Sequence, residues 1–403
     1  MADRATDFWK RWRELAAAFL KLGALSYGGA AIMGIMQAEL QQKREWLSKE
    51  RFLEGLALVQ MLPGAPATQL AIFIGHERAG WRGGVLTGIC FILPGFLILL
   101  TLTLLYAAYG SLPLIRDALY GLGPVVLGIF VVALIRLGKV ALSNKPQLAI
   151  AIVAALFVAV TPLGVAGVLM LAGCAGVALY HSRAAGLRAA LAVTLLIGAY
   201  HLSEILLASQ SPHQDVSTVV APGLWDIAKF FSHAGALTFG GGITVLGFVQ
   251  DQVVNRFHWL TPQEFLDGLA LGQLTPGPIL TLAAYVGYKL CGLAGAFVGV
   301  LSIFLPSFVL ILSVLPIVNR FRKLAWIKAA MKAIGAAVIG VISVTLLHLT
   351  PYAVPDAFTA VLLVATVLVM LLWSVTPLPL MAAGGLIGIV TRLRAFQRLR
   401  DLA

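Results

Sequence analysis

Charged residues are scarce in this chain of 403 residues, at 11% against 60% hydrophobic residues. Soluble domains carry about 25% charged residues, so the composition excludes an ordinary soluble domain. Apolar runs such as 85–108 and 297–318 are long enough to cross a hydrocarbon core of about 30 Å as helices. The short alternating segments of a membrane β-barrel are missing. The sequence therefore predicts an all-α polytopic membrane protein.

Cysteine is also rare, and the three that occur lie singly in apolar stretches, at Cys90, Cys174 and Cys291. None has the spacing of a metal or redox site. The chain contains no H-E-x-x-H, no G-x-S-x-G and no paired intramembrane aspartates, so it lacks the usual signatures of an intramembrane enzyme. We therefore expect no catalytic residues, no metal and no cofactor.

Acidic residues are few: 17 Asp and Glu stand against 29 Lys and Arg, which gives a net charge of +12. A basic balance can indicate nucleic-acid binding. Here the basic residues gather in short loops and at helix ends, where they set the orientation of a membrane protein and contact anionic lipid. We expect membrane lipid, and no nucleic acid, as the partner of these charges.

One sequence element is present twice. Residues 23–29 read G-A-L-S-Y-G-G and residues 235–241 read G-A-L-T-F-G-G, an offset of 212. Pro94 and Pro306 share that offset. The chain therefore divides into a first repeat at 1–185, a connecting transmembrane helix and loop at 186–222, and a second repeat at 223–403.

Each repeat also carries a Pro-Gly motif, P-G-A-P at 63–66 and P-G-P at 276–278. Proline inside a helix removes a hydrogen bond and clashes with the preceding turn, and glycine relaxes the backbone beside it. Both motifs should therefore interrupt a helix. In a membrane the freed backbone groups must be buried in protein or line a wet cavity. Duplicated discontinuous helices of this kind are typical of a secondary transporter.

The topology depends on whether each broken helix pair crosses the membrane or turns back. If each pair is one discontinuous crossing, the chain has about thirteen spans and the copies are inverted; if each pair is re-entrant, about eleven spans remain and the copies are parallel. The distribution of Lys and Arg fits both alternatives equally well. We favour thirteen spans and inverted copies, with the N-terminus inside and the C-terminus outside, because this places the basic N-terminal cluster inside.

The residues after each break begin a new half-helix, whose free N–H groups and positive dipole end suit an anion. Thr68, Gln69 and Thr281 stand there and can donate hydrogen bonds. The alternative is a kink that serves packing alone. We favour a binding site, because two related breaks occupy equivalent positions. Its residues are Pro63, Gly64, Thr68, Gln69, Thr275, Pro276, Gly277, Pro278 and Thr281.

The two glycine runs lie in the middle of expected helices. Glycine permits close contact between membrane helices, which is the structural interpretation. The functional interpretation is local unwinding, which would expose backbone amides to a substrate. On that interpretation the binding residues include Ser26, Gly28, Gly29, Thr238, Gly240 and Gly241. Together with the two breaks, these positions would surround one oxyanion.

Three ionisable residues within expected helices are candidates for a role in transport, because such residues are costly in a membrane. Lys21 could attract a dianion, or its side chain could extend to the membrane surface instead. Glu54 and Asp267 stand at equivalent positions in the first half-helix of each broken pair. They could carry coupling protons, or they could be solvated surface acids.

At these residues the chain resembles the chromate ion transporter (CHR) family in its long, two-domain form. The resemblance covers about Phe19 to Leu386, nearly the whole chain. Lys21 departs from it, because arginine is common there. The motifs that carry the resemblance are F-L-K-L-G-A-L-S-Y-G-G at 19–29, the W-L to L-P-G block at 46–64, L-P-G-F at 93–96, L-T-F-G-G-G at 237–242 and L-T-P-G-P at 274–278.

The resemblance implies export of chromate, a tetrahedral dianion, with sulfate as a close structural competitor, and resistance to chromate in prokaryotes. We therefore predict a secondary active transporter, not an enzyme, in the plasma (inner) membrane of a prokaryote. An uptake carrier or channel for sulfate-like anions is the alternative, and an intramembrane enzyme is a remote one. Whether the chain forms a homodimer stays open.

Overall fold

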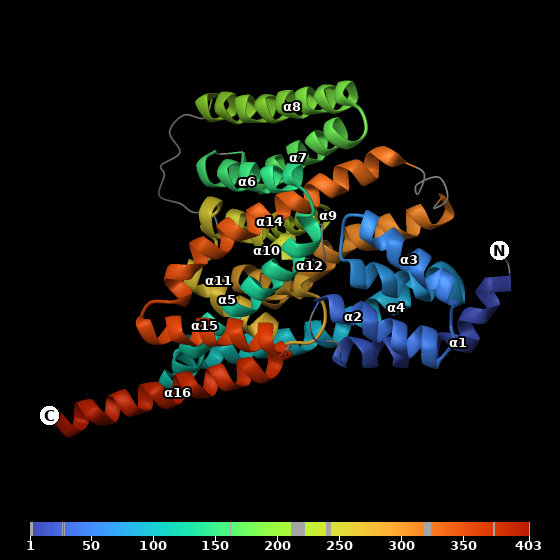
Figure 1. Cartoon of the computed structure of the whole chain (residues 1–403). Helices are drawn as coiled ribbons and strands as arrows, with labels where there is room; N and C mark the ends of the chain where they lie inside the picture. Colours follow the sequence, from blue (N-terminus) through green and yellow to red (C-terminus); the bar gives the residue numbers. More distant parts are fainter. Residues whose placement is uncertain are drawn as a thin grey trace.

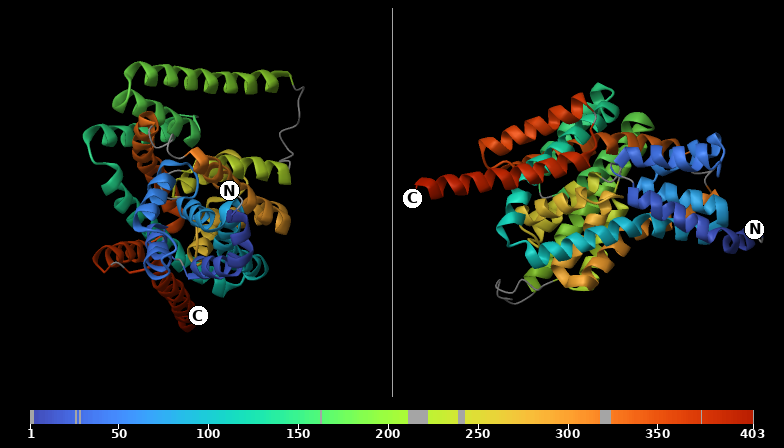
Figure 2. Two further views of the ribbon diagram at one scale, coloured as in Figure 1. Left: turned by 90° about the vertical axis from the view of Figure 1, so that its right-hand side faces the viewer. Right: turned by 90° about the horizontal axis from the view of Figure 1, so that it is seen from below.

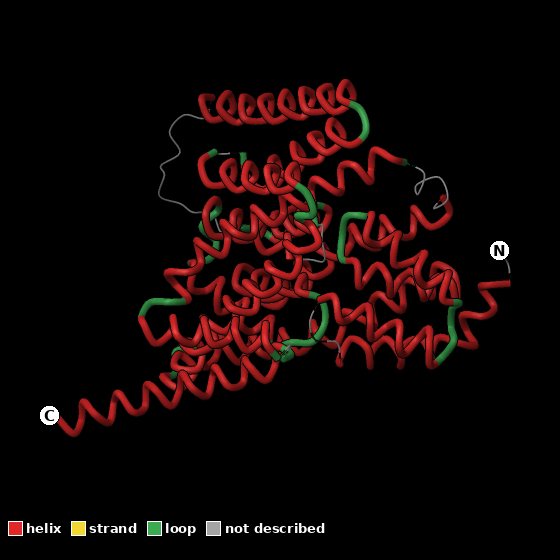
Figure 3. The backbone as a smooth tube through the Cα atoms, in the orientation of Figure 1, coloured by secondary structure: helices red, strands yellow, loops and turns green. Residues whose placement is uncertain are grey.

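The computed structural model describes residues 3–25, 27, 29–161, 163–210, 222–238, 243–317, 324–373 and 375–402. These residues form helices joined by short loops, and no strand occurs among them (Figure 3). The predicted all-α class is therefore confirmed. The N-terminus and the C-terminal helix extend from opposite ends of the molecule (Figures 1 and 2).

The elements of the first half are, in chain order, α1 (Asp3–Leu25), α2 (Gly29–Met36), the π-helix η1 (Gln37–Lys43), α3 (Lys49–Met61), α4 (Pro66–Tyr109), α5 (Pro113–Ala141), α6 (Lys145–Val160), α7 (Gly164–Tyr180) and α8 (Arg183–Gln210). Those of the second half are α9 (Leu224–Ala236), α10 (Ile243–Gln250), the π-helix η2 (Asp251–Arg256), α11 (Pro262–Gln273), η3 (Ile279–Thr281), α12 (Leu282–Val314), η4 (Leu315–Ile317), α14 (Ala325–Ala353), α15 (Ala357–Leu372) and α16 (Pro377–Leu402).

The broken helix pair of the first repeat folds back on itself. The chain leaves α3, turns at Gly64 with a φ of 122°, and enters α4. Gly55 of α3 lies directly against the ring of Phe73 in α4. Nearer the open end, Arg51 pairs with Glu77 at 2.9 Å. Because both contacts join residues equally far from Gly64, α3 and the start of α4 are antiparallel arms of a hairpin whose tip is the Pro-Gly motif.

Helix α4 reverses again at Ala79 and Gly80, where Gly80 has a φ of 65° and a ψ of −161°. Only glycine adopts that backbone conformation without strain. On either side of the turn Gly75 and Gly83 touch so closely that neither has room for a Cβ. Helix α4 thus consists of a short arm, 66–79, and a long arm, 80–109, that pack against each other.

The second repeat has the same two reversals. The tip lies at Gly277, with a φ of 99°. Glu264 of α11 and Lys289 of α12 close the open end of the hairpin with an ion pair of 2.7 Å. Helix α12 then turns at Cys291 and Gly292, which gives a short arm, 282–291, and a long arm, 292–314.

Local signals in the sequence start the first arm of each hairpin. Ser48 caps α3 by accepting a hydrogen bond from the N–H of Arg51. Thr261 caps α11 through a capping box with Glu264, and Pro262 occupies the first helical turn. These side chains satisfy N–H groups that a helix start otherwise leaves unpaired.

A further hairpin precedes each broken pair. Helix α1 ends at Leu25, and α2 with η1 carries the chain back to the side where α1 begins. There the indole of Trp46 donates a hydrogen bond of 3.1 Å to Glu14. In the second repeat, α9 and α10 form the corresponding hairpin, and Phe230 of α9 stacks on Phe248 of α10. The ends of α1 and α9, at Leu25 and Ala236, therefore lie near the tips of these hairpins.

The two repeats are inverted relative to each other. The long arms of α4 and α12 run antiparallel, since Phe96 packs against Phe297 while Gly88 packs against Phe308. The hairpins of the first repeat consequently open at the face where α1 begins, here the N face. Those of the second open at the face where α16 ends, here the C face. In Figure 1 the blue helices α1–α3 and the yellow helices α10 and α11 accordingly lie toward opposite ends of the molecule.

This arrangement corrects the predicted number of spans. The broken pairs turn back, as in the eleven-span alternative, and yet the copies are inverted, as in the thirteen-span alternative. Both counts treated segments 15–36 and 225–248 as single crossings, whereas each belongs to a hairpin. Five helices then separate the two sets of hairpins: the long arm of α4 and helices α5 to α8. Among the described residues, four helices are fit by length and composition to cross a membrane: α4, α5, α12 with η3, and α14. The shorter apolar helices are α6, α7, α15 and the first part of α16.

The remaining helices interlock across the repeats. Helix α14 packs on α6 and α7, while α5 packs on α15 and α16. Glycines make these contacts close: Gly340 of α14 touches the carbonyl of Ala151 in α6, and Gly121 of α5 touches the carbonyl of Gly384 in α16. Small residues let membrane helices approach in this way. Each repeat therefore covers a central helix of the other.

Candidate functional site

The hairpin tips of the two repeats meet inside the molecule. The N–H of Gly64, in the first Pro-Gly motif, donates a hydrogen bond of 2.7 Å to the carbonyl of Thr238, beside the second glycine run. The next N–H, of Ala65, donates to the hydroxyl of Ser307 in the long arm of α12 at 2.8 Å. The first break is therefore held by residues of the second repeat, and two of its freed N–H groups are satisfied within protein.

The second break makes the reciprocal contact. The carbonyl of Pro276 lies directly against Gly95 in the long arm of α4. Gly277 also faces Gly95 and the carbonyl of Gly23 in α1, with space left around its own Cα. Gly95 and Ser307 occupy equivalent positions, each one residue after the proline inside its long arm. Each break thus contacts the other repeat: the first contacts Thr238 and Ser307, and the second contacts Gly95 and Gly23.

Two polar atoms at the first break lack a partner among the described residues. They are the hydroxyl of Thr68 and the side-chain carbonyl of Gln69, and both residues are fully buried. The amide nitrogen of Gln69 instead donates to the carbonyl of Pro63 at 2.7 Å. The first N–H groups of α4 add further donors here, since a helix start leaves them unpaired within the helix. An unpartnered hydroxyl beside a helix N-terminus is suited to an anion.

The other predicted hydroxyls are occupied by their own backbone. Thr238 donates to Ala234, Thr275 to Gly272 and Thr281 to Pro278, at 2.7–2.8 Å. They support the tips, whereas Thr68 offers a free polar group. Ser26, Gly28, Gly240 and Gly241 lie outside the described residues, and Gly29 opens α2.

Lys21 is not brought to the tips. It is exposed on α1 beside the exposed Leu20, while its neighbours Phe19 and Leu22 are buried. Its face of α1 is the outer one, which corresponds to the extended, surface-directed interpretation of this lysine.

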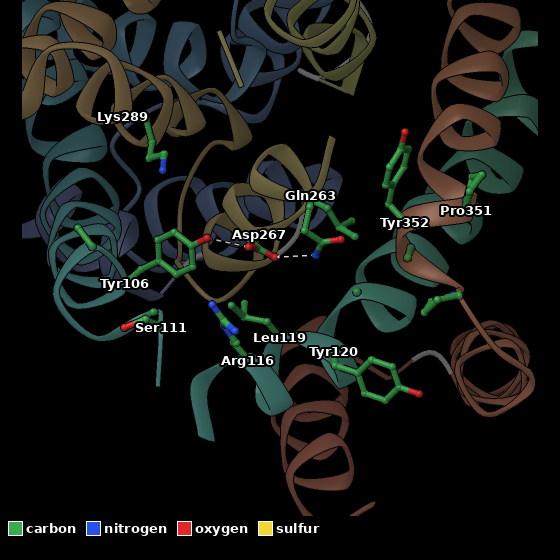
Figure 4. A pocket seen from close by; sticks show the side chains of 16 residues that line it. Tyr106, Ser111, Arg116, Leu119, Tyr120, Gln263, Asp267, Lys289, Pro351 and Tyr352 are labelled. Carbon is green, nitrogen blue, oxygen red and sulfur yellow. Dashed lines mark hydrogen bonds between the residues drawn. The ribbon is translucent and has the colours of Figure 1, made fainter. Parts of the chain in front are cut away.

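The two predicted coupling acids have different surroundings. Glu54 is 40% exposed and pairs with Arg51 at 2.7 Å. Asp267 is only 7% exposed and accepts hydrogen bonds from the hydroxyl of Tyr106 at 2.7 Å and from Gln263 at 3.1 Å. It lines a cavity of about 670 Å³ at the C face (Figure 4).

Three residues of this region did not emerge from the sequence: Gly95, Ser307 and Tyr106. The duplicated prolines at 94 and 306 lie in the helical turns that contact the breaks. The sequence did not show that the next residue in each turn, Gly95 or Ser307, makes the contact. The partner of Tyr106 is 161 residues away, and nothing local announces it. Among the described residues no group of His, Cys, Asp and Glu could hold a metal ion.

Comparison with known proteins gives the chain a family. The family model described as chromate transporter matches residues 13–179 and 225–389, so it matches twice. A chromate transport protein of Cupriavidus metallidurans is 33% identical over 94% of this chain and 92% of its own length. A chromate transport protein of Pseudomonas aeruginosa is 32% identical over 83% and 80%, and a probable one of Synechococcus elongatus is 31% identical over 82% of each chain.

No solved structure matches this chain. The family model, however, spans most of it, and both matched segments contain a pair of the hairpins described above. The relatives are named as transporters, which points away from an enzyme. The chain belongs to the chromate transporter family.

Proposed function

We propose that this protein is a secondary active transporter that exports chromate across the plasma membrane of a prokaryote and so confers resistance to chromate. The observation that carries the proposal is the contact between hairpin tips that enter from opposite faces, with the free hydroxyl of Thr68 beside them. Inverted repeats whose broken helices meet in the middle of the membrane are a common design of secondary transporters.

The distribution of basic residues supports an inside location for the N face. Short loops with an excess of Lys and Arg stay in the cytoplasm. Described basic residues near the N face include Arg13, Lys43, Arg44, Arg82, Lys139, Lys145, Arg183 and Lys328. Those near the C face include Arg116, Arg256, Lys289 and the arginines of the last part of α16. The same basic cluster would raise the local concentration of a dianion at the side from which it is exported.

The packing of the core suggests how the site opens alternately. The buried apolar residues form two clusters, one around the hairpins of the first repeat and one around the rest of the molecule. The clusters meet within the long arms, between Phe91 and Ile92 of α4 and between Phe304 and Ile311 of α12. Each boundary lies near the proline of its arm. Rocking of one cluster against the other would expose the tips to each face in turn.

The test is flux of labelled chromate in vesicles of known orientation, with sulfate as a parallel substrate. Thr68→Val should raise the apparent KM for chromate about 5- to 10-fold, because one hydrogen bond is worth about 1 kcal/mol. Thr103→Val is the matched control, since Thr103 is equally buried but donates to its own helix at Leu99. An unchanged KM in Thr68→Val would remove Thr68 from the site. A wild-type protein that moves sulfate but not chromate would instead establish the sulfate carrier.

A further inference from the structure

The cavity at the C face lies between the two repeats. It opens where the hairpin of α11 and α12 meets the ends of α4, α5 and α14. Its polar lining comes from both repeats: Tyr106, Arg116, Tyr120, Gln263, Asp267 and Lys289. Figure 4 shows the carboxylate of Asp267 between Tyr106 and Gln263, joined to both by hydrogen bonds. Asp267 is therefore a buried acid that water in the cavity can reach.

Asp267 has no ion pair within 4 Å among the described residues, because the neighbouring Lys289 pairs with Glu264. A buried carboxylate without a cation is unfavourable, and the charged form is the one that burial disfavours. Two hydrogen bonds offset part of that penalty. Burial thus favours the neutral form of Asp267, and the two hydrogen bonds favour the charged form.

The equivalent acid of the first repeat lacks this property. Glu54 shares the guanidinium of Arg51 with Glu77, at 2.7 and 2.9 Å. The position of Arg51 is taken in the second repeat by Glu264, and the position of Glu77 by Lys289. Both hairpins therefore have an ion pair between their arms, but the acid and the base have changed places between the two repeats. With this exchange, the cation of the hairpin pairs with Glu264, and Asp267 lacks the ion pair that Glu54 makes with Arg51.

Other ionisable groups surround Asp267 on the elements that pack against it. They are Arg116 and Tyr120 of α5, Tyr352 of α14, Tyr285 and Lys289 of α12, and Glu264 of its own helix, which pairs with Lys289. No histidine lines the cavity among the described residues. Among the described residues that line the cavity, Asp267 is the carboxyl without an ion pair.

We propose that Asp267 is the residue that binds the proton in a proton–chromate exchange, with Tyr106 as its positioning residue; this rests on the proposed function. Water in the cavity at the outer face transfers a proton to a carboxylate oxygen. A neutral carboxyl accepts the hydrogen of Tyr106 more weakly than a carboxylate does, and one of its oxygens becomes a donor. The contact between α11 and the long arm of α4 therefore weakens and rearranges. The hairpin carries this change to its tip at Gly277. After the opposite face opens, the proton returns to water there.

The experiment measures chromate flux in oriented vesicles with and without a proton gradient, together with chromate–chromate exchange at equal pH. Asp267→Asn fixes the neutral form. It should abolish the acceleration by the gradient, at least 10-fold in the wild type, while exchange stays within about 3-fold. Asp267→Glu should restore part of the acceleration. Glu54→Gln, at the equivalent position, should keep its response to the gradient whatever its total rate.

Tyr106→Phe gives an independent reading if Asp267→Asn does not fold. Loss of the donated hydrogen bond disfavours the carboxylate, so the pH of half-maximal transport should rise by about 0.5–1 unit. A wild-type flux that ignores the gradient, or Asp267→Asn vesicles that respond to it fully, would overturn the inference and leave chromate transport intact. Absence of any chromate flux in the wild type would overturn the proposed function itself.

Discussion

The N–H of Gly64 donates a hydrogen bond to the carbonyl oxygen of Thr238, at 2.7 Å. The two residues stand at the tips of hairpins that belong to different repeats and open at opposite faces. Because the bond joins two backbone groups, it holds the tips of the two hairpins together whatever side chains stand there. Any movement that opens the site to one face must either break this bond or carry both tips together.

Replacement of Gly64 should be the most damaging change at the tips. Gly64 has a φ of 122°, and an added Cβ would lie 2.5 Å from Gln69 and 2.6 Å from Ser307. The left-handed conformation alone costs an L-residue about 1–2 kcal/mol. We expect Gly64→Ala to lower the melting temperature in detergent and to reduce chromate flux at least 10-fold.

Gly277→Ala is the matched comparison for Gly64→Ala. Gly277 shares the positive φ, at 99°, but its nearest described neighbours would lie 3.9 Å from a Cβ. Gly277→Ala should therefore show the backbone strain without the clash, and its melting temperature should fall less. If the melting temperature falls equally in the two variants, backbone strain alone accounts for the loss of stability. Ser307 would then not restrict the first tip.

Ser307→Ala should destabilise the first break. The variant leaves the buried N–H of Ala65 without its acceptor, and an unpaired buried donor costs about 1–3 kcal/mol. Ser343→Ala serves as the control, because Ser343 donates only to its own helix at Ile339. Thermal unfolding in detergent should separate the two variants by several degrees. A Ser307→Ala protein as stable as Ser343→Ala would show that the break finds another acceptor.

The exchanged ion pairs allow the pattern of the first repeat to be transferred to the second. Glu264→Arg combined with Lys289→Glu places an arginine three residues before Asp267, as Arg51 stands before Glu54. A cation there favours the carboxylate. We expect the double variant to fold, with the pH profile of chromate flux displaced to lower pH by about 1 unit or more. If the pH profile of the double variant coincides with that of the wild type, Asp267 is not the group that sets the pH dependence.

The hairpin topology predicts the side of the membrane on which η1 lies. Gln42 is exposed on η1 at the N face, whereas a thirteen-span chain would place it outside. In a variant without the three native cysteines, Gln42→Cys should react with a membrane-impermeant maleimide only after the cells are opened. Ser111→Cys, at the mouth of the cavity, should react in intact cells. Labelling of Gln42→Cys from outside would show that the segment 15–36 is a single crossing and not part of a hairpin.

The repeats and the breaks could be predicted from the sequence, because they depend on composition and on duplicated short motifs. The inversion was favoured over parallel copies, but from a count of spans that the structure corrects. The first hairpin of each repeat could not. The run from Leu15 to Met36 has the length of a single crossing, and glycines at 28 and 29 suit a tight helix contact as well as a tip. Only the tertiary bond between Trp46 and Glu14 shows that the chain has come back.

The site was predicted in part for a similar physical reason. Proline and glycine interrupt helices, so the breaks at Gly64 and Pro276 could be predicted from these residue types alone. Their partners, Ser307 and Gly95, lie on helices of the opposite repeat and depend on how the long arms cross. The difference between Glu54 and Asp267 was equally hidden, since it depends on a charge exchange between neighbouring arms.

The interlocked helices also restrict how such a chain can be divided. Helix α14 rests on α6 and α7, and α5 rests on α15 and α16, so each repeat on its own would expose the glycine-lined faces that the other covers. Two fragments cut between α8 and α9 should therefore be unstable apart and stable when expressed together. A protein made of one repeat would have to insert its copies in both directions to bury the same faces.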